Sequence, residues 1–240
     1  MSGHSKWSTI KRAKGANDQK RGAIFTKLAN AIAIAVKEGG GDINFNFKLR
    51  LAVEKAREAN MPKDNIQRAI DKGLGQGGSG SLSEAMFEGF AHGGIAVIVE
   101  AITDNTNRTA GELRAIFSKN GGSLGSTGSV SYLFERVGEI VVSVDLLEKA
   151  IDAGAVDYEE DGPQINIFTN VSDLHKVKES LGAKVAEIVY RPKKETMVKV
   201  SEPGQKEKLE EFLNMLEDLD DVQKVFANVE FENGVRTSKD

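Results

Sequence analysis

The sequence predicts an α+β protein in which an N-terminal helical bundle is followed by two ferredoxin-like α+β domains, one inserted in the other. Three observations lead to this prediction. Apolar residues recur at helical spacing through the first 75 residues, a Gly/Ser-rich stretch follows, and the remaining chain alternates between strand and helix patterns. A chain of 240 residues also exceeds the roughly 150 residues of a common single domain, so several domains are expected.

The N-terminal section, predicted as residues 1–75, contains three amphipathic helices. Apolar residues between Gln19 and Val36 fall on one helical face. A second stripe runs from Leu49 to Ala59 and ends at Met61-Pro62, because proline disfavours a helical residue before it. Asp64 is predicted to cap a short third helix. No single helix can bury its own stripe, so we expect a bundle.

Residues 76–83 are predicted as a flexible linker. The stretch Gly73–Ser81 contains five glycines and two serines, a composition typical of linkers. Gly75–Gly80 also matches the dinucleotide-binding pattern G-x-G-x-x-G. That mechanism requires a preceding strand, whereas a helix precedes this stretch, so we interpret it as a linker.

The chain beyond the linker begins with a predicted βαβ unit. Ile95–Ile102 is an almost unbroken apolar run, typical of a buried central strand. Thr109–Glu112 has the spacing of a capping box, which predicts a helix start. Alternation over Val130–Glu135 predicts a second strand.

Residues 138–191 are predicted to form a β-α-β-β-α-β set, the ferredoxin-like order. Its strands and helices are expected, in chain order, at Glu139–Val144, Leu146–Ala153, Val156–Glu159, Gln164–Thr169, Leu174–Leu181 and Val185–Tyr190. A further βαβ follows, with strands at Met197–Val200 and Val225–Phe231 around a helix. We therefore predict one discontinuous α+β domain from residues 84–135 plus 196–240, with residues 136–195 inserted in it. A serial order of three domains is the alternative.

Charge is divided unevenly along the chain. The first 75 residues hold 15 Lys/Arg against 7 Asp/Glu, a net charge of +8, and the rest of the chain carries −12. A basic module on an acidic body is typical of proteins that bind a polyanion. Basic side chains are densest near the N-terminus, where a tryptophan adds a stacking surface. The candidate nucleic-acid-binding residues are Lys6, Trp7, Lys11, Arg12, Lys14, Lys20, Arg21 and Lys27. The alternative interpretation is a solvated charged face.

The sequence contains no pattern that indicates a catalytic site or a metal site. Cysteine is absent, which excludes disulfides, thiol nucleophiles and cysteine-based metal sites. Gly121–Gly125 matches G-x-S-x-G, but it leaves a helix and enters a strand, the reverse of a nucleophile elbow. Asp218, Asp220 and Asp221 are interpreted as a solvated helix end. We expect no catalytic residue, no metal, no cofactor and no small-molecule substrate, and hence no enzyme.

The expected location is the cytoplasm. No stretch approaches the roughly 18 apolar residues of a membrane span, so no membrane partner is expected. The first 14 residues contain no apolar segment of the kind found in secretory signals.

Several long motifs together resemble the YebC/PmpR family. They lie in order along nearly the whole chain, at Gly3–Trp7, Lys20–Leu28, Asn60–Ile66, Thr103–Thr109, Asn120–Gly125, Gly128–Val130 and Asp221–Gln223. The resemblance implies a helical domain plus two α+β domains and a cytoplasmic, non-enzymatic regulator. Family members are usually described as DNA-binding transcriptional regulators, and related proteins, including a mitochondrial translational activator, act on the ribosome.

The first hypothesis is therefore a DNA-binding transcriptional regulator whose basic N-terminal side chains bind the phosphates of the nucleic acid. Such contacts give affinity but little sequence information, and no Arg, Asn and Gln pattern typical of a recognition helix stands out. A ribosome-associated translation factor that contacts ribosomal RNA is consequently the alternative. A protein-interaction scaffold is the third hypothesis.

Overall fold

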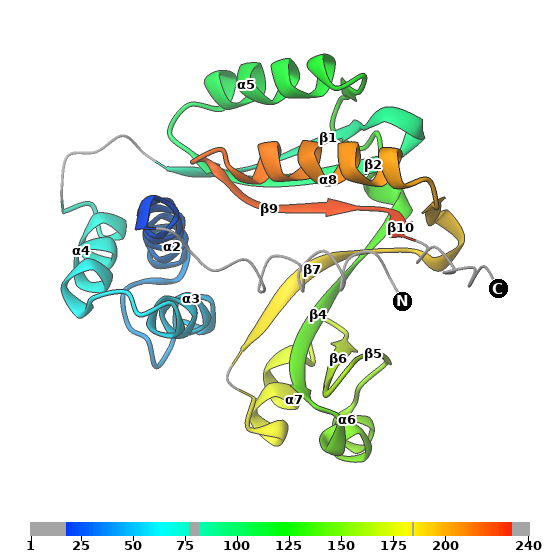
Figure 1. Cartoon of the computed structure of the whole chain (residues 1–240). Coiled ribbons are helices and arrows are strands. Elements are labelled where there is room, and N and C mark those ends of the chain that lie inside the picture. The colour runs from blue at the N-terminus through cyan, green and yellow to red at the C-terminus, as the bar shows by residue number, and fades with distance from the viewer. Residues whose placement is uncertain (1–17, 77–81, 184, 232–240) are drawn as a thin grey trace.

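The structure, a computed structural model, describes residues 18–76, 82–183 and 185–231 (Figure 1). Three helices lie to one side of two antiparallel sheets, each of which carries its own pair of helices. The predicted α+β class, with helices first and sheets after them, is confirmed.

The helical part consists of α2 (Asp18–Gly39), α3 (Phe47–Glu58) and α4 (Lys63–Gly73). Its core is formed by the predicted apolar stripes, with members including Ile32, Val36, Leu49, Val53, Ala56, Ile66 and Ile70. The side chain of Asn46 ties two of the helices together. Its Oδ1 accepts from the Leu49 N–H at the start of α3, and its Nδ2 donates to the Ala35 carbonyl of α2 at 2.7 Å.

The first sheet has the order β3-β1-β2-β9. Its strands are β1 (Ser83–Phe90), β2 (Ala96–Thr103), β3 (Ser123–Leu124) and β9 (Val222–Ala227), all paired antiparallel. Helices α5 (Thr106–Lys119) and α8 (Pro203–Glu217) cover one face of this sheet (Figure 1). Phe117 of α5 and Phe212 of α8 meet edge to face over it, with ring centroids 5.0 Å apart.

The second sheet has the order β5-β6-β4-β7. Its elements are β4 (Phe134–Ser143), α6 (Leu147–Ala153), β5 (Asp157–Asp161), β6 (Gln164–Thr169), α7 (Leu174–Leu181) and β7 (Ala186–Pro192). All three strand pairs are antiparallel, so the ferredoxin-like order predicted for residues 138–191 is confirmed. The first sheet is built differently, because β1 and β2 form a hairpin before its first helix.

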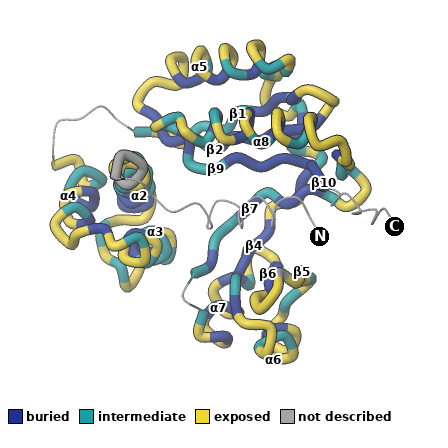
Figure 2. Tube along the Cα trace, in the orientation of Figure 1, coloured by how far each residue is buried: buried dark blue, intermediate teal, exposed yellow. Residues whose placement is uncertain are grey.

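The faces of the two sheets that their helices leave open pack against each other. Ile98 and Phe226 of the first sheet contact a cluster that includes Phe134, Phe168 and Val189 of the second. Strand β2 is buried on both faces, which explains the unbroken apolar run in the sequence. Figure 2 shows this arrangement, with buried strands inside and exposed helix surfaces outside.

The structure corrects three predictions about the first half of the α+β region. Strand β1 was not predicted, and it replaces the expected βαβ unit by a hairpin. Helix α5 begins at Thr106 rather than at Thr109, because Asn105 is the N-cap residue and accepts from the Arg108 N–H. The strand predicted over Val130–Glu135 is wrong, since Ser131–Leu133 is a 3₁₀ turn and β4 starts only at Phe134.

Two further corrections concern helix and strand ends. Asp64 does not cap α4, since Pro62 is the N-cap residue and Asp64 lies in the first turn. The strand predicted over Val225–Phe231 is divided into β9 and β10 (Val229–Phe231), which pairs parallel with β8 (Val198–Val200). Asn228 sits at the division, where its side chain accepts from the Ala96 N–H of β2.

Chain segments on both sides of β4–β7 meet in one sheet, because β9 pairs with β2. The limits of the domains, at residues 84–135 plus 196–240 and 136–195, remain a prediction.

Candidate nucleic-acid interface and the polar cluster beside it

Most of the predicted nucleic-acid-binding residues lie outside the described residues. These are Lys6, Trp7, Lys11, Arg12 and Lys14. Lys20 and Arg21 are placed in the first turns of α2, in the basic helical part. The assignment of all seven to a nucleic-acid surface therefore stays a prediction.

Lys27 occupies a different environment. Its ammonium group, part-buried, donates to the carbonyl oxygen of Glu217 at the end of α8. A cation is favourable there, because the carbonyl groups at a helix C-terminus carry partial negative charge. In this structure Lys27 thus joins the helical part to the first sheet.

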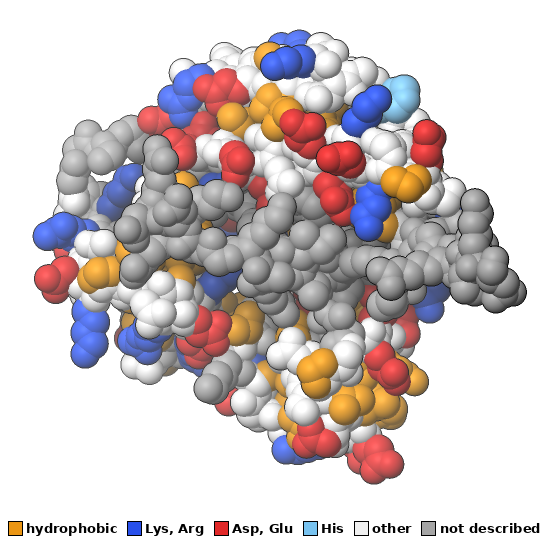
Figure 3. Space-filling model, viewed as in Figure 1, with side chains coloured by type: hydrophobic (Ala, Val, Ile, Leu, Met, Phe, Trp, Pro, Cys, Tyr) orange, Lys and Arg blue, Asp and Glu red, His pale blue; other side chains and the backbone are white. Residues whose placement is uncertain are grey.

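Other basic side chains of the helical part remain open to solvent. Arg57, Lys63 and Arg68 are exposed and make no hydrogen bond or ion pair within the ranges that the structure describes. They lie at the end of α3 and along α4. Acidic side chains instead gather over α8, which carries Glu207, Glu210 and Glu211 (Figure 3).

A polar cluster, here called the Asp221 cluster, lies where β2, α5 and β9 meet. Its members are Thr103, Asp104, Asn105, Arg108, Thr109 and Asp221. Oδ2 of Asp221 is 2.7 Å from the Thr109 hydroxyl, 3.0 Å from the Thr103 hydroxyl and 2.8 Å from Nη2 of Arg108. One carboxylate oxygen therefore holds the end of β2, the first turn of α5 and the start of β9 together.

Both carboxylates of the cluster pair with the same guanidinium group. The Arg108 guanidinium also contacts Asp104 at 2.9 Å, so a single cation lies between two carboxylates. Burial alone would raise the pKa of Asp221, but the Arg108 and threonine contacts hold that pKa below its ordinary value. The cluster consequently works as a structural joint at neutral pH, and half of the Arg108 side chain stays exposed beside it.

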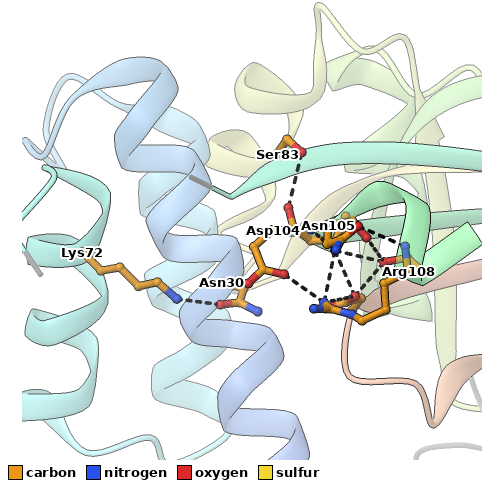
Figure 4. Close-up of polar contacts among 9 residues, drawn as sticks. Asn30, Lys72, Ser83, Asp104, Asn105 and Arg108 are labelled. Carbon is orange, nitrogen blue, oxygen red and sulfur yellow. Dashed lines mark hydrogen bonds and ion pairs between the residues drawn. The ribbon is translucent and has the colours of Figure 1, made fainter. Parts of the chain in front are cut away.

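Helix α2 passes next to this joint. Figure 4 shows Asn30 of α2 between Lys72 of α4 and Asp104 at the start of α5. Nζ of Lys72 lies 3.4 Å from Oδ1 of Asn30. This bond joins α4 to α2 within the helical part.

A second junction is a cavity of about 770 Å³ where the helical part and both sheets meet. Glu187 of β7 lies in its wall, with its carboxylate 2.9 Å from Lys55 of α3 and 3.0 Å from Lys224 of β9. These two ammonium groups hold the pKa of Glu187 well below its ordinary value, although burial opposes that shift. Nε2 of Gln223 is buried in the same wall and has no hydrogen-bond partner among the residues that the structure describes. The cavity walls are polar, but their charges are largely paired.

Reasoning from the sequence missed the role of Asp221. The sequence pattern indicates a solvated helix end, whereas the Asp221 carboxylate is mostly buried and accepts three hydrogen bonds. A signal was present in Thr103–Thr109, where hydroxyl and amide side chains directly follow a buried strand. Such side chains need hydrogen-bond partners, and an acid distant in sequence supplies them.

Comparison with known proteins decides the family. A model described as the TACO1/YebC protein N-terminal domain matches residues 5–76, and a model described as the TACO1/YebC second and third domain matches residues 82–229. The chain belongs to the TACO1/YebC family. The resemblance drawn from the motifs is thereby confirmed.

Relatives of this TACO1/YebC chain match it over nearly their whole length. A protein of Caldanaerobacter subterraneus subsp. tengcongensis is 48% identical over 97% of this chain and 100% of its own. One of Rubrobacter xylanophilus is 49% identical over 98% of both. Each is named a probable transcriptional regulatory protein. The solved structure of a conserved hypothetical protein from Aquifex aeolicus matches with a TM-score of 0.85 and 42% identity, covering 93% of this chain and 96% of that one.

The described residues contain neither a membrane-spanning helix nor a cluster of metal ligands. No helix there combines the length and apolar character needed to cross a membrane. Within the same ranges, no three His, Asp or Glu side chains are grouped as ligands of a metal ion would be.

Proposed function

We propose that this TACO1/YebC chain is a non-enzymatic, cytoplasmic regulator that binds nucleic acid, with DNA as its target and transcription as the process it regulates. The naming of its relatives as probable transcriptional regulatory proteins supports the regulatory role. The proposed contact residues are Lys6, Trp7, Lys11, Arg12, Lys14, Lys20 and Arg21. Lys27 is not among the contacts open to nucleic acid in the arrangement described, because its ammonium group there binds the Glu217 carbonyl at the end of α8.

The observation that carries this proposal is the division of charge. Residues 1–75 carry +8 and the rest of the chain carries −12, so a polyanion is attracted to one end and repelled by the other. Lysine and arginine contacts to phosphates release condensed counterions, which makes binding steeply dependent on salt. Phosphate contacts orient the protein on the duplex, and specificity then comes from the shape of the DNA.

The direct test replaces Lys11, Arg12, Lys14, Lys20 and Arg21 by Gln and measures the binding of a labelled DNA duplex by fluorescence anisotropy at several salt concentrations. If each base contacts one phosphate, the slope of log K against log salt should become shallower by roughly 0.9 per residue. A matched control replaces five exposed bases of the acidic body by Gln and should leave the slope unchanged; these are Arg114, Lys119, Lys149, Lys176 and Lys208.

Unchanged binding after removal of the N-terminal bases would overturn the proposal. A comparison of promoter fragments with random duplex, and of both with ribosomal RNA, tests the choice of target. Salt-sensitive binding of ribosomal RNA, together with equal binding of promoter and random DNA, would instead assign the chain to translation.

A further inference from the structure

Four lysines of the helical part reach across to acceptors in the rest of the chain. Lys27 donates to the Glu217 carbonyl, and Lys37 donates to the Leu82 carbonyl at 2.9 Å. Lys48 contacts the Glu84 carboxylate at 2.7 Å, and Lys55 contacts the Glu187 carboxylate at 2.9 Å. We call Lys27, Lys37, Lys48 and Lys55 the lysine face. Four ammonium groups of the helical part are thus occupied by two backbone carbonyls and two carboxylates from the rest of the chain.

Other contacts across this boundary combine an ion pair with aromatic and apolar packing. Lys178 of α7, buried, pairs with Glu54 of α3 at 2.9 Å. The ring of Phe47 lies 4.5 Å from that of His175, and Leu51 packs against the core beneath α7. Boundaries that combine ion pairs with limited apolar packing are typical of domains that move relative to each other. The exposed ion pairs at Lys48 and Lys55 are also weakened by salt.

We propose that the lysine face is a second surface for the sugar–phosphate backbone, and that the acidic sheets cover it in this structure as an autoinhibitory contact. Phosphates compete with Glu84 and Glu187 for the same ammonium groups, and binding separates the helical part from the sheets. A nucleic acid carries one charge for roughly every 1.7 Å of duplex, a denser array than these carboxylates form. This inference rests on the proposed function and adds to it a closed state that nucleic acid must open.

The decisive variant is Lys178→Met. It removes a buried ammonium group that holds the two parts together, and methionine fills a similar apolar volume. The remaining Glu54 carboxylate is 32% exposed, so water can solvate it and no fully buried charge is left. Circular dichroism of the variant checks that it is folded. Because the substitution deletes a positive charge, simple electrostatics predicts weaker binding of a labelled random DNA duplex. Release of the lysine face predicts the opposite, with binding tighter by about threefold or more, since the competent fraction of molecules increases.

A second variant tests the cover itself. Glu84→Gln removes the contact that Lys48 makes across the boundary to β1, while Lys48 keeps its pair with Glu38 of α2 at 2.7 Å. Loss of the contact to β1 should tighten binding of the same duplex by about threefold. The matched control is Glu112→Gln, which removes the same charge from an exposed position on α5 that makes no ion pair in the described part of the chain. If both substitutions tighten duplex binding equally, the change comes from the net charge of the chain alone, and the proposal is overturned.

Opening can be observed directly by zero-length carbodiimide coupling of lysine to carboxylate in the wild-type protein. The Lys178–Glu54 pair should couple in the free protein and lose that coupling when the duplex saturates it. Neither residue belongs to the lysine face, so the loss reports separation rather than shielding by bound DNA. Persistence of the coupling in the saturated complex would overturn the proposal.

Failure of the proposed function gives a different pattern. In that case the wild-type chain does not bind the duplex or ribosomal RNA through its N-terminal bases at all. If the wild-type chain binds but Lys178→Met binds equally or more weakly, the proposed function stands and the autoinhibitory contact is overturned.

Discussion

Asp221 shows how a single carboxylate joins elements that are distant in sequence. Its Oδ2 meets two hydroxyl groups and one guanidinium group, drawn from the end of β2 and the first turn of α5. Most of the stabilisation should come from the threonines, because the Arg108 pair is half-exposed and such pairs contribute little.

Asp221→Asn should lower the free energy of unfolding by about 1–3 kcal/mol, since charge-assisted hydrogen bonds to buried hydroxyl groups are weakened. Urea unfolding of the full chain measures the effect. Asp220→Asn is the control, because Asp220 is exposed and makes no hydrogen bond or ion pair within the described ranges. Equal stability of the two variants would contradict the structural role given to Asp221.

Glu88 fixes the loop that precedes β4. Its buried carboxylate accepts from the N–H groups of Gly128, Val130 and Ser131 at 2.7–2.8 Å. These bonds occupy the backbone groups that a strand would need, which is why the predicted strand at this position does not form. Burial alone would raise the pKa of Glu88, but the three N–H groups hold it below the ordinary value of 4.5.

The lowered pKa of Glu88 predicts a specific loss of stability in acid. In the unfolded chain Glu88 takes up its proton near pH 4.5, whereas the folded protein resists protonation until a lower pH. Its stabilising contribution is therefore complete above pH 4.5 and is lost as the pH falls through the folded pKa. Free energies of unfolding measured from pH 6 downward should decline less steeply for Glu88→Gln than for the wild type. Parallel pH profiles would contradict this assignment.

Two helical glycines differ in the space around them. Gly73 ends α4 against α2, and Gly111 lies exposed inside α5. A Cβ atom at Gly73 of α4 would lie 2.6 Å from the Ala33 carbonyl oxygen and 2.6 Å from Cβ of Val36, both on α2. A Cβ atom at Gly111, within α5, would meet nothing within 4 Å. Close packing of two helices therefore requires glycine at the first position, and nothing requires it at the second.

Gly73→Ala should destabilise the protein by about 1–3 kcal/mol, because α4 must move away from α2. Gly111→Ala should stabilise it by up to about 1 kcal/mol, because alanine favours a helix interior over glycine. Thermal and urea unfolding measure both changes. Stabilisation by both substitutions would show that α2 and α4 pack less closely than described.

Elements with a strong internal pattern were predictable from the sequence, and those defined by partners were not. Helices α2 and α3 follow from apolar periodicity over many residues, and strand β2 follows from an almost unbroken apolar run. Strand β1 alternates weakly, and its identity depends on pairing with β2, which local sequence does not reveal. The division between β9 and β10 likewise depends on the bond that Asn228 makes to β2.

At the scale of the whole molecule, the two sheets share one core. Phe226 of β9 is only 2% exposed and packs between them, with its ring 5.6 Å from that of Tyr190 on β7. Because each sheet leaves an apolar face uncovered by its own helices, neither is expected to be stable without the other.

Phe226→Ala should therefore destabilise both sheets together, by about 3–5 kcal/mol, through the cavity it leaves. Amide hydrogen exchange at Val97 in the first sheet and at Ile140 in the second should accelerate in parallel. Tyr132→Ala, at a side chain 63% exposed, should change stability by no more than about 0.5 kcal/mol. Faster exchange in the first sheet alone would show that the sheets unfold independently.

Patterns in the amino-acid sequence alone predicted the α+β class, the three N-terminal helices, the ferredoxin-like order of residues 138–191, the charge division and the family. These features depend on local periodicity, composition and motifs, which are properties of neighbouring residues. The three-dimensional structure was needed to show that Asp221 joins β2 to α5 and that four lysines face the acidic sheets. It also showed that Glu88 holds residues 128–131 in a loop where a strand was expected. Each of these depends on a polar group finding a partner far along the chain, and such pairing is fixed by packing in three dimensions.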